Sequence, residues 1–268
     1  NAIVGNKLAH AYLFCGPRGV GKTTCARIFA KTINCLSPRE DGESCGECES
    51  CKAFDEGRSM NIHELDAASN NSVEDIRELI KQVQIPPQIG KYKVFIIDEV
   101  HMLSPNAFNA FLKTLEEPPH HAIFILATTE LHKLPATIVS RCQRFEFRRI
   151  ATDILTSRIK FIAEQEGIEI EDDAARLIAR YSQGGMRDSI SLLELCAGAN
   201  TKIDESVVFD TVGSGNRDSS FRIIELIRVD FGDHKDVLTR NTVFLHPFSY
   251  TFTNGLFIAI HICSVNQP

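Results

Sequence analysis

The chain has 268 residues, 43% of them hydrophobic, and a formal net charge of −6 at pH 7. This is an ordinary soluble globular composition, with room for one large domain or for two to three small ones. The negative charge argues against wholesale coating of nucleic acid, so any DNA contact would use a local patch. The longest apolar stretch near the end, residues 255–262, is far shorter than the about 20 residues that span a bilayer.

Both ends of the chain look incomplete. The sequence opens at Asn1 without a methionine, and only a short amphipathic stretch precedes the first predicted strand. We therefore expect that an N-terminal segment is missing and that the C-terminus is also incomplete. No signal peptide is recognisable, which favours a cytoplasmic location.

The first pattern that carries chemistry is an apolar run, a glycine-rich loop and a helical pattern in direct succession. Residues 11–15 are apolar, the loop GPRGVGKT follows, and residues 24–33 have the apolar spacing of a helix. Such a loop predicts an ATP site whose backbone N–H groups cradle the phosphates. Lys22 would meet the β- and γ-phosphates, and Thr23 would supply a hydroxyl to Mg²⁺. The residues predicted to bind nucleotide here are Gly16, Pro17, Arg18, Gly19, Val20, Gly21, Lys22, Thr23 and Thr24.

Four cysteines form a small insert after this helix. Cys35, Cys45, Cys48 and Cys51 are separated by nine, two and two residues. This spacing lets four thiolates surround one tetrahedral Zn²⁺ at about 2.3 Å per bond. Disulfides and buried free thiols are the alternatives, although thiols stay reduced in the cytosol. The pattern therefore favours a structural zinc site. The remaining cysteines are scattered and are interpreted as packing residues: Cys15, Cys25, Cys142, Cys196 and Cys263.

Three further strands are predicted, over residues 62–66, 94–97 and 122–127. The last two are continuous apolar runs, and helical patterns separate the strands. Such runs are typical of parallel strands buried on both faces, which predicts an α/β fold. Functional residues then belong at the carboxyl ends of the strands.

A helix is predicted over residues 72–83, between the second and third strands. Ser72, with Asp75 three residues later, is interpreted as its N-cap, although Asp is a weaker partner than Glu in a capping box.

Polar residues follow two of the apolar strands. Asp98 would hold Mg²⁺, and Glu99 would orient or deprotonate the attacking water. A solvated acidic pair on the surface is the alternative. Thr129 is placed to hold the water and the γ-phosphate, in preference to Thr128. His101 either helps to couple the site or is a structural histidine.

The pattern changes after about residue 150 to amphipathic helices without strands. They are predicted over residues 153–166, 172–182 and 186–199, and a further helical segment over 205–231. We interpret residues 1–150 as the nucleotide-binding core with its insert at 35–51, residues 151–204 as a three-helix, all-α second domain, and residues 205–268 as the incomplete start of a third domain whose tail we cannot place.

Two arginines stand in contexts that suggest a role in hydrolysis, because the developing charge needs cations beyond Lys22. Arg141 lies in the sequence SRC, and Arg187 lies in GGMRD. A surface salt bridge is the usual interpretation of a single arginine.

Taken together, these motifs resemble a known family. GPRGVGKT, the four-cysteine insert, IIDEVHMLS, FLKTLEEPP, LATTE, LPATIVSRCQRF and GGMRDSISLL are similar to the gamma/tau family of bacterial DNA polymerase III, the AAA+ ATPase motor of the sliding-clamp loader. The resemblance covers about residues 1–230.

The resemblance implies a role for each candidate residue. Arg141 would reach in trans into a neighbour's ATP site, Thr129 would be the first sensor, and Arg187 would be the second sensor, in cis. The partners implied are delta and delta-prime subunits and further gamma/tau copies in a pentameric ring, the beta sliding clamp, and primer–template DNA. The enzyme would be an ATPase within the polymerase holoenzyme, not the polymerising subunit. By motif position, the residues facing the DNA backbone would be Ser72, Arg77, Lys113 and Thr137.

Two departures from the family concern assembly. The family has an N-terminal segment that closes over the adenine, ahead of the position of Asn1, and a third, collar domain that residues 233–268 do not resemble.

Three other functions are possible: a Holliday-junction-type helicase or related remodeller, a non-hydrolysing structural subunit, and a small-molecule P-loop kinase. The cysteine cluster with the SRC and LEEPP sequences argues against the first, the complete set of ATP-site residues against the second, and the arginine finger with a helical lid against the third.

Overall fold

The computed structural model describes residues 8–199 and 202–213. The predicted helix over 205–231 is described only in its first part, and the tail from 214 to 268 lies outside the described residues, as does Cys263.

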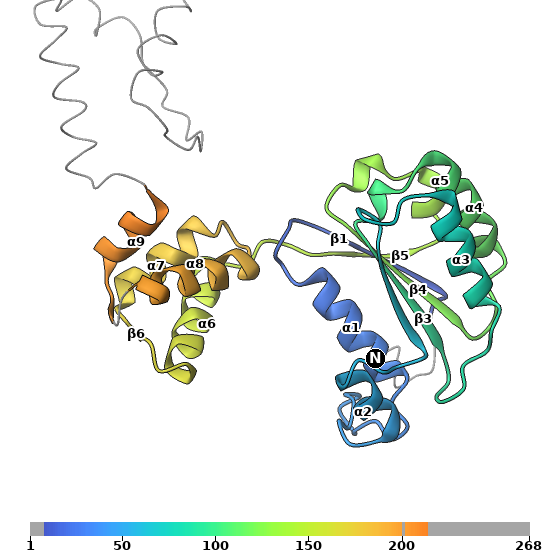
Figure 1. The fold of residues 1–268 in the computed structure, drawn as a ribbon, viewed down its shortest axis with the longest axis horizontal. Helices are drawn as coiled ribbons and strands as arrows, with labels where there is room; N and C mark the ends of the chain where they lie inside the picture. The colour runs from blue at the N-terminus through green and yellow to red at the C-terminus, as the bar shows by residue number, and fades with distance from the viewer. Residues whose placement is uncertain (1–7, 200–201, 214–268) are drawn as a thin grey trace, which may run out of the picture. The chain divides into compact units, whose positions relative to one another are not determined.

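The described residues divide into two compact units, drawn in Figure 1. The first takes the chain up to Leu155 and also includes Ser182–Ile190, and the second contains Thr156–Tyr181 and the chain from Ser191. The domain boundaries predicted at residues 150 and 204 stay predictions. In the part of the chain that the structure describes, no helix is long and apolar enough to cross a membrane.

A five-stranded sheet lies at the centre of the first unit. Its strands are β1 (Ala11–Cys15), β2 (Ile62–Asp66), β3 (Lys93–Asp98), β4 (Ala122–Thr128) and β5 (Gln143–Glu146). All neighbours are parallel, in the order β2-β3-β4-β1-β5. The three central strands are almost wholly apolar and buried, as expected where both faces of a sheet are covered. The predicted α/β fold is therefore confirmed.

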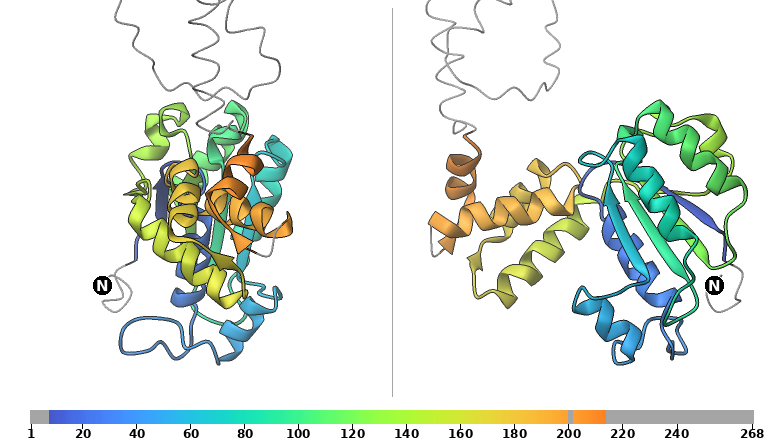
Figure 2. Two further views of the ribbon diagram at one scale, coloured as in Figure 1. Left: turned by 90° about the vertical axis from the view of Figure 1, so that its left-hand side faces the viewer. Right: turned by 45° about the vertical axis from the view of Figure 1, so that its right-hand side comes forward.

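Helices cover both faces of this sheet (Figures 1 and 2). They are α1 (Lys22–Ile33), α3 (Val73–Val83), α4 (Pro105–Glu116) and α5 (Ala136–Val139), with short 3-10 turns η1 (Val100–Met102) and η2 (Leu131–Lys133). Helix α2 (Glu49–Asp55) belongs to the cysteine insert and contacts α1. Successive residues of a strand point to opposite faces. In β1, Tyr12 packs in the core beneath α1, whereas Leu13 packs in the core beneath α3 and α4.

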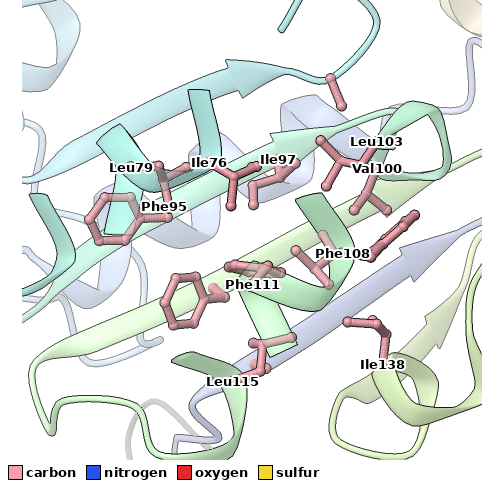
Figure 3. Packing of buried hydrophobic residues seen from close by; sticks show 14 of the residues in the cluster. Ile76, Leu79, Phe95, Ile97, Val100, Leu103, Phe108, Phe111, Leu115 and Ile138 are labelled. Carbon is pink, nitrogen blue, oxygen red and sulfur yellow. The ribbon is translucent and has the colours of Figure 1, made fainter. Parts of the chain in front are cut away.

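Aromatic side chains fill the second of these cores, which Figure 3 shows from close by. Phe111 of α4 meets Phe124 of β4 edge-to-face, with ring centroids 5.2 Å apart, and Phe95 of β3 stacks on Phe124. Val100 and Leu103, which follow β3, are buried in the same cluster. The core therefore fixes the segment after β3, where Glu99 and His101 lie.

The predicted cap of α3 is confirmed. The Ser72 hydroxyl oxygen accepts from the Asp75 backbone N–H at 3.1 Å, and the Asp75 carboxylate accepts from the Ser72 backbone N–H at 3.1 Å. Asp75 therefore completes a capping box in the position that Glu usually takes.

Two details of the predicted secondary structure were wrong. The second unit contains a short parallel ladder of β6 (Glu169–Ile170) with β7 (Lys202–Ile203), where helices without strands were expected. Two residues are too few to show a periodic pattern. Strand β5 was also missed, because its residues are all exposed at the sheet edge and lack an apolar run. The helices of the second part are α6 (Thr152–Gln165), α7 (Asp172–Tyr181), α8 (Met186–Ala199) and α9 (Glu205–Val212).

Candidate functional site

The glycine-rich loop lies between β1 and α1, as predicted. An added Cβ at Gly16, where φ is +154°, would lie 2.2 Å from the carbonyl oxygen of Phe147, so this position requires glycine. Gly21 is the N-cap of α1, and it offers no side-chain cap to the first-turn N–H groups of the helix. These N–H groups and the helix dipole suit an anionic ligand.

Lys22 is buried at the start of α1. Its Nζ donates to the carbonyl oxygens of Gly16 at 2.9 Å and of Pro17 at 2.8 Å, and the residue is 6% exposed. Burial lowers the pKa of Lys22, while the carboxylates of Glu99 and Asp98 oppose that change. An ammonium that is buried against carbonyl groups gains from a nearby anion, so phosphate oxygens would suit this position.

Thr23 and Asp98 come together at the carboxyl end of β3. The Thr23 hydroxyl donates to the Asp98 carboxylate at 2.5 Å. A hydroxyl and a carboxylate next to a phosphate loop are oxygen ligands of the kind that Mg²⁺ takes, with phosphates and water completing the shell. These two side chains would therefore hold the Mg²⁺ that accompanies a nucleotide.

Glu99 adopts a left-handed backbone conformation, with φ 45° and ψ 43°, which is uncommon outside glycine. Its Oε2 accepts from the Thr129 hydroxyl at 3.0 Å and from the Thr129 backbone N–H at 3.3 Å. The Thr128 side chain lies elsewhere: its Oγ1 is 3.0 Å from Nδ1 of His101. Of the two threonines, Thr129 is therefore the one that contacts Glu99.

Arg187 begins α8 beside the phosphate loop. Its backbone N–H donates to the carbonyl oxygen of Gly19 at 3.3 Å, and its side chain is exposed. The sequence GGMRD therefore lies against the loop that would hold the phosphates. Two of the residues predicted to bind nucleotide are exposed: Arg18 in the glycine-rich loop and Thr24 in the first turn of α1.

Arg141 is held by a residue that the sequence did not single out. Its Nη2 donates to Oε1 of Glu116 at 2.8 Å, and its Nη1 donates to the carbonyl oxygen of Thr137 at 2.7 Å. Glu116 and Glu117 end α4, where acidic residues oppose the helix dipole. An acidic residue at this position lowers the stability of the helix, so its presence just before two prolines indicates that Glu116 has another role, which is the ion pair with Arg141.

The four cysteines of the insert converge on one point. Their Sγ atoms all lie within 4.8 Å of one another, with Cys35 3.5 Å from Cys45 and 4.0 Å from Cys48. Zn–S bonds of about 2.3 Å in a tetrahedron place sulfurs about 3.8 Å apart, whereas a disulfide needs about 2.05 Å. The cluster therefore fits a zinc ion, and the sulfurs are too far apart for a disulfide.

The pKa values of the thiols also favour a metal site. Burial works against a charged Cys48, but hydrogen bonds from the backbone of Leu36 and Cys51 and from the thiols of Cys51 and Cys45 together lower the pKa of Cys48 to about 6. Burial, followed by the hydrogen bond with Cys48, raises the pKa of Cys51 to about 12. Neighbouring thiolates repel one another, and a bound divalent cation would stabilise all four.

The interpretation of the other cysteines is confirmed in part. Cys15 and Cys196 are buried and Cys142 is partly buried, but Cys25 is exposed on α1, so the packing role predicted for Cys25 was wrong. Its helix turns this side chain away from the sheet.

The four residues expected to face DNA come from the helical layer that contains α3, α4 and α5. The Ser72 hydroxyl is engaged in the α3 cap, and Arg77 lies 3.7 Å from Glu74 in an exposed pair. Lys113 and Thr137 are exposed. A DNA role for these residues stays a prediction.

Comparison with known proteins identifies the family. A family model described as DNA polymerase III, delta subunit, matches residues 1–151, more than half of the chain. A second, described as DNA polymerase III clamp loader subunit, ATPase lid domain, matches residues 155–195. The chain belongs to the DNA polymerase III clamp-loader family.

Relatives within this family carry the tau and gamma names. The chain is 53% identical over 194 residues to DNA polymerase III subunit tau of Bacillus subtilis, covering 72% of this chain and 34% of that protein. It is 42% identical over 229 residues to subunit tau of Escherichia coli, covering 84% of this chain and 35% of that protein. The chain spans about a third of the length of these curated relatives. The resemblance to gamma/tau subunits is therefore confirmed.

Among solved structures, the fold is similar to that of the RuvB Holliday junction branch migration motor of Thermotoga maritima. The TM-score is 0.55 at 20% identity, covering 86% of this chain and 72% of that chain. At that identity the likeness concerns the fold alone, a parallel sheet with a helical lid.

Proposed function

We propose that this clamp-loader chain is an ATP-hydrolysing motor subunit, which opens a sliding clamp and loads it on primer–template DNA during replication. The observation that carries the proposal is the meeting of Lys22, Thr23, Asp98 and Glu99 at the carboxyl ends of β1 and β3, the two strands on either side of β4, in a member of this family. A subunit that only supports its neighbours would not need all four groups.

Each side chain has one part in the hydrolysis that we propose. Lys22 leaves the loop carbonyls for the β- and γ-phosphates, and Thr23 and Asp98 would hold Mg²⁺, which would offset the charge of the phosphates. Glu99 orients the attacking water and accepts its proton while the bond from the γ-phosphorus to the bridging oxygen breaks. The products are ADP and inorganic phosphate.

Three further groups would respond to the γ-phosphate. Thr129 would donate its hydroxyl to the γ-phosphate or the water, and Arg187, at the start of α8 beside the loop, would contact the chain's own nucleotide. Arg141 would enter the ATP site of a neighbouring subunit. These assignments assume a pentameric ring with delta, delta-prime and further gamma/tau copies, with DNA facing Ser72, Arg77, Lys113 and Thr137.

A zinc ion in the cysteine cluster would have a structural role. Four thiolates close its coordination shell, and α1, about 18 Å long, separates the cluster from the phosphate loop. We expect about one zinc per chain in the purified protein. Cys48→Ser should lose that metal and lower the melting temperature, because binding of a structural metal is coupled to folding. Elemental analysis and thermal melts would check this, with Cys25→Ser as the matched control.

Well under one zinc per folded wild-type chain would contradict the structural assignment. So would a Cys48→Ser variant that keeps both its metal and its melting temperature. Nucleotide binding should survive in Cys48→Ser at temperatures where the variant is folded.

The proposed function is tested by the ATPase activity of the chain alone, and then with cognate delta and delta-prime subunits, beta clamp and primed DNA. We expect a low rate from the chain alone and a large, stepwise stimulation by these partners, because the trans arginine must come from a neighbour. Stimulation by Holliday-junction DNA without the clamp would instead favour a helicase. No partner-dependent hydrolysis under any combination would overturn the proposal.

A further inference from the structure

His101 lies in η1, three residues after Asp98, and its side chain is 6% exposed. We infer that His101 is a positioning residue for hydrolysis: it keeps the Glu99 carboxylate aligned when the Thr129 hydroxyl turns to the nucleotide. This inference rests on the proposed function and deepens it, because it assigns a task to a buried side chain that touches neither phosphate nor metal.

Two hydrogen bonds and one close contact with His101 converge on one oxygen of Glu99. The Thr129 hydroxyl lies 3.0 Å from Oε2, the Thr129 backbone N–H lies 3.3 Å from it, and His101 Nδ1 also lies 3.3 Å from it. Among the described residues, Oε1 receives no hydrogen bond. The carboxylate is therefore held by Oε2 and presents Oε1, the oxygen that can accept from a water.

The surroundings of His101 fix where its proton lies. Nδ1 faces Oε2 of Glu99 and, at 3.0 Å, Oγ1 of Thr128. An ionised carboxylate only accepts hydrogen bonds, so the tautomer with a proton on Nδ1 suits this contact, and that one proton is shared between Oγ1 of Thr128 and Oε2 of Glu99. The Thr128 oxygen already accepts from the Glu130 backbone N–H at 3.0 Å, which keeps that hydroxyl in place. The histidine thus links the end of β4 to the residue that follows β3.

Nucleotide binding makes this second donor necessary. The single hydroxyl proton of Thr129 can go to Glu99 or to a γ-phosphate oxygen, but it cannot serve both fully. When it moves to the phosphate, Glu99 loses the shorter of its two hydrogen bonds and keeps the Thr129 backbone N–H and the contact with Nδ1 of His101. His101 stays, because its ring is enclosed and the nearby residues Val100 and Leu103 are buried in the core. Without it, the Glu99 side chain would sample other rotamers and the water would be less well oriented.

The test compares His101→Ala, His101→Asn and, as a matched control, His120→Ala, all in the full chain assembled with its partner subunits, clamp and primed DNA. His120 is exposed in the loop before β4, at the amino ends of the parallel strands, whereas the phosphate loop lies at their carboxyl ends. Steady-state ATP hydrolysis gives kcat and KM, and titration of a fluorescent ATP analogue gives Kd. Melting temperatures are measured for every variant, and Glu99→Gln is included as the variant that lacks the proposed general base.

We expect His101→Ala to lower kcat by about 10- to 100-fold, the effect of losing a hydrogen bond to a charged group, with Kd changed less than about twofold. His101→Asn should recover most of the rate, because the amide nitrogen of Asn occupies the position of Nδ1 and still donates. His120→Ala should match the wild type. A merely structural histidine would instead change stability and nucleotide affinity together, without rescue by Asn.

Several results would overturn the inference. They are an unchanged kcat in folded His101→Ala, an equal loss in His101→Asn and His101→Ala, and a loss of nucleotide binding that accounts for the whole loss of rate. The wild type and Glu99→Gln separate this failure from that of the proposed function. If the wild type hydrolyses ATP in a way that depends on Glu99, only the positioning role fails; if it does not, both fail.

Discussion

Glu99→Gln is expected to bind ATP as the wild type does and to hydrolyse it at least about 100-fold more slowly. Glutamine keeps the size of the side chain, and its amide oxygen can still accept from Thr129, so the site should keep its shape. The amide cannot take a proton from water, and general-base catalysis contributes about 10²–10⁴ in rate. Titration of a fluorescent ATP analogue and single-turnover phosphate release would measure the two effects separately.

Lys22→Ala is the contrasting variant. It removes the buried ammonium that would leave the Gly16 and Pro17 carbonyl groups for the phosphates, so productive ATP binding itself should disappear. The two variants therefore differ in the step at which they fail. An equal loss of affinity in both would show that one of the two side chains has been assigned the wrong role.

The parallel sheet could be predicted because its central strands carry strong local signals. β1, β3 and β4 are apolar along almost their whole length, and glycine, proline or polar residues end each run. Edge strand β5 and the two-residue strands β6 and β7 give no such signal, since pairing with distant residues creates them. Those strands follow from tertiary structure and cannot be read from short sequence windows.

The candidate site likewise contains residues that the sequence could identify and contacts that it could not. Lys22, Thr23, Asp98 and Glu99 could be selected because each follows a strand or a glycine-rich loop, where parallel topology brings polar groups together. The contacts of Glu99 with Thr129 and His101 depend on the register of β3 with β4 and on a left-handed residue, which the sequence does not reveal. The pairing of Glu116 with Arg141 joins the last residue of α4 to a residue 25 positions later, just after α5, and only the structure could identify it.

Arg141→Ala is expected to leave the ATP affinity of the isolated chain almost unchanged and to reduce hydrolysis strongly in the assembled loader. An arginine supplied in trans is worth about 10³–10⁵ in rate for other NTPases. We expect the lower end or less, because the Arg141 side chain is 34% exposed and would have to leave Glu116 to reach a neighbour's phosphate. Partner-stimulated ATPase, compared with ATP binding by the chain alone, would measure the difference. Arg187→Ala should instead weaken the chain's own response to nucleotide, because that contact is in cis.

Mixed assemblies decide between a trans and a cis role for Arg141. If Arg141→Ala and Lys22→Ala are carried on separate chains, some interfaces pair an intact phosphate loop with an intact arginine, and those sites should hydrolyse ATP. The matched control is Arg58→Ala, which removes an exposed arginine that pairs with Glu56 and should leave the rate unchanged. A mixture that recovers no activity above either single variant would rule out the trans role. A loss of ATP binding in the isolated Arg141→Ala chain would do the same, and Arg141 would then be a surface salt-bridge residue that holds α5 to the end of α4.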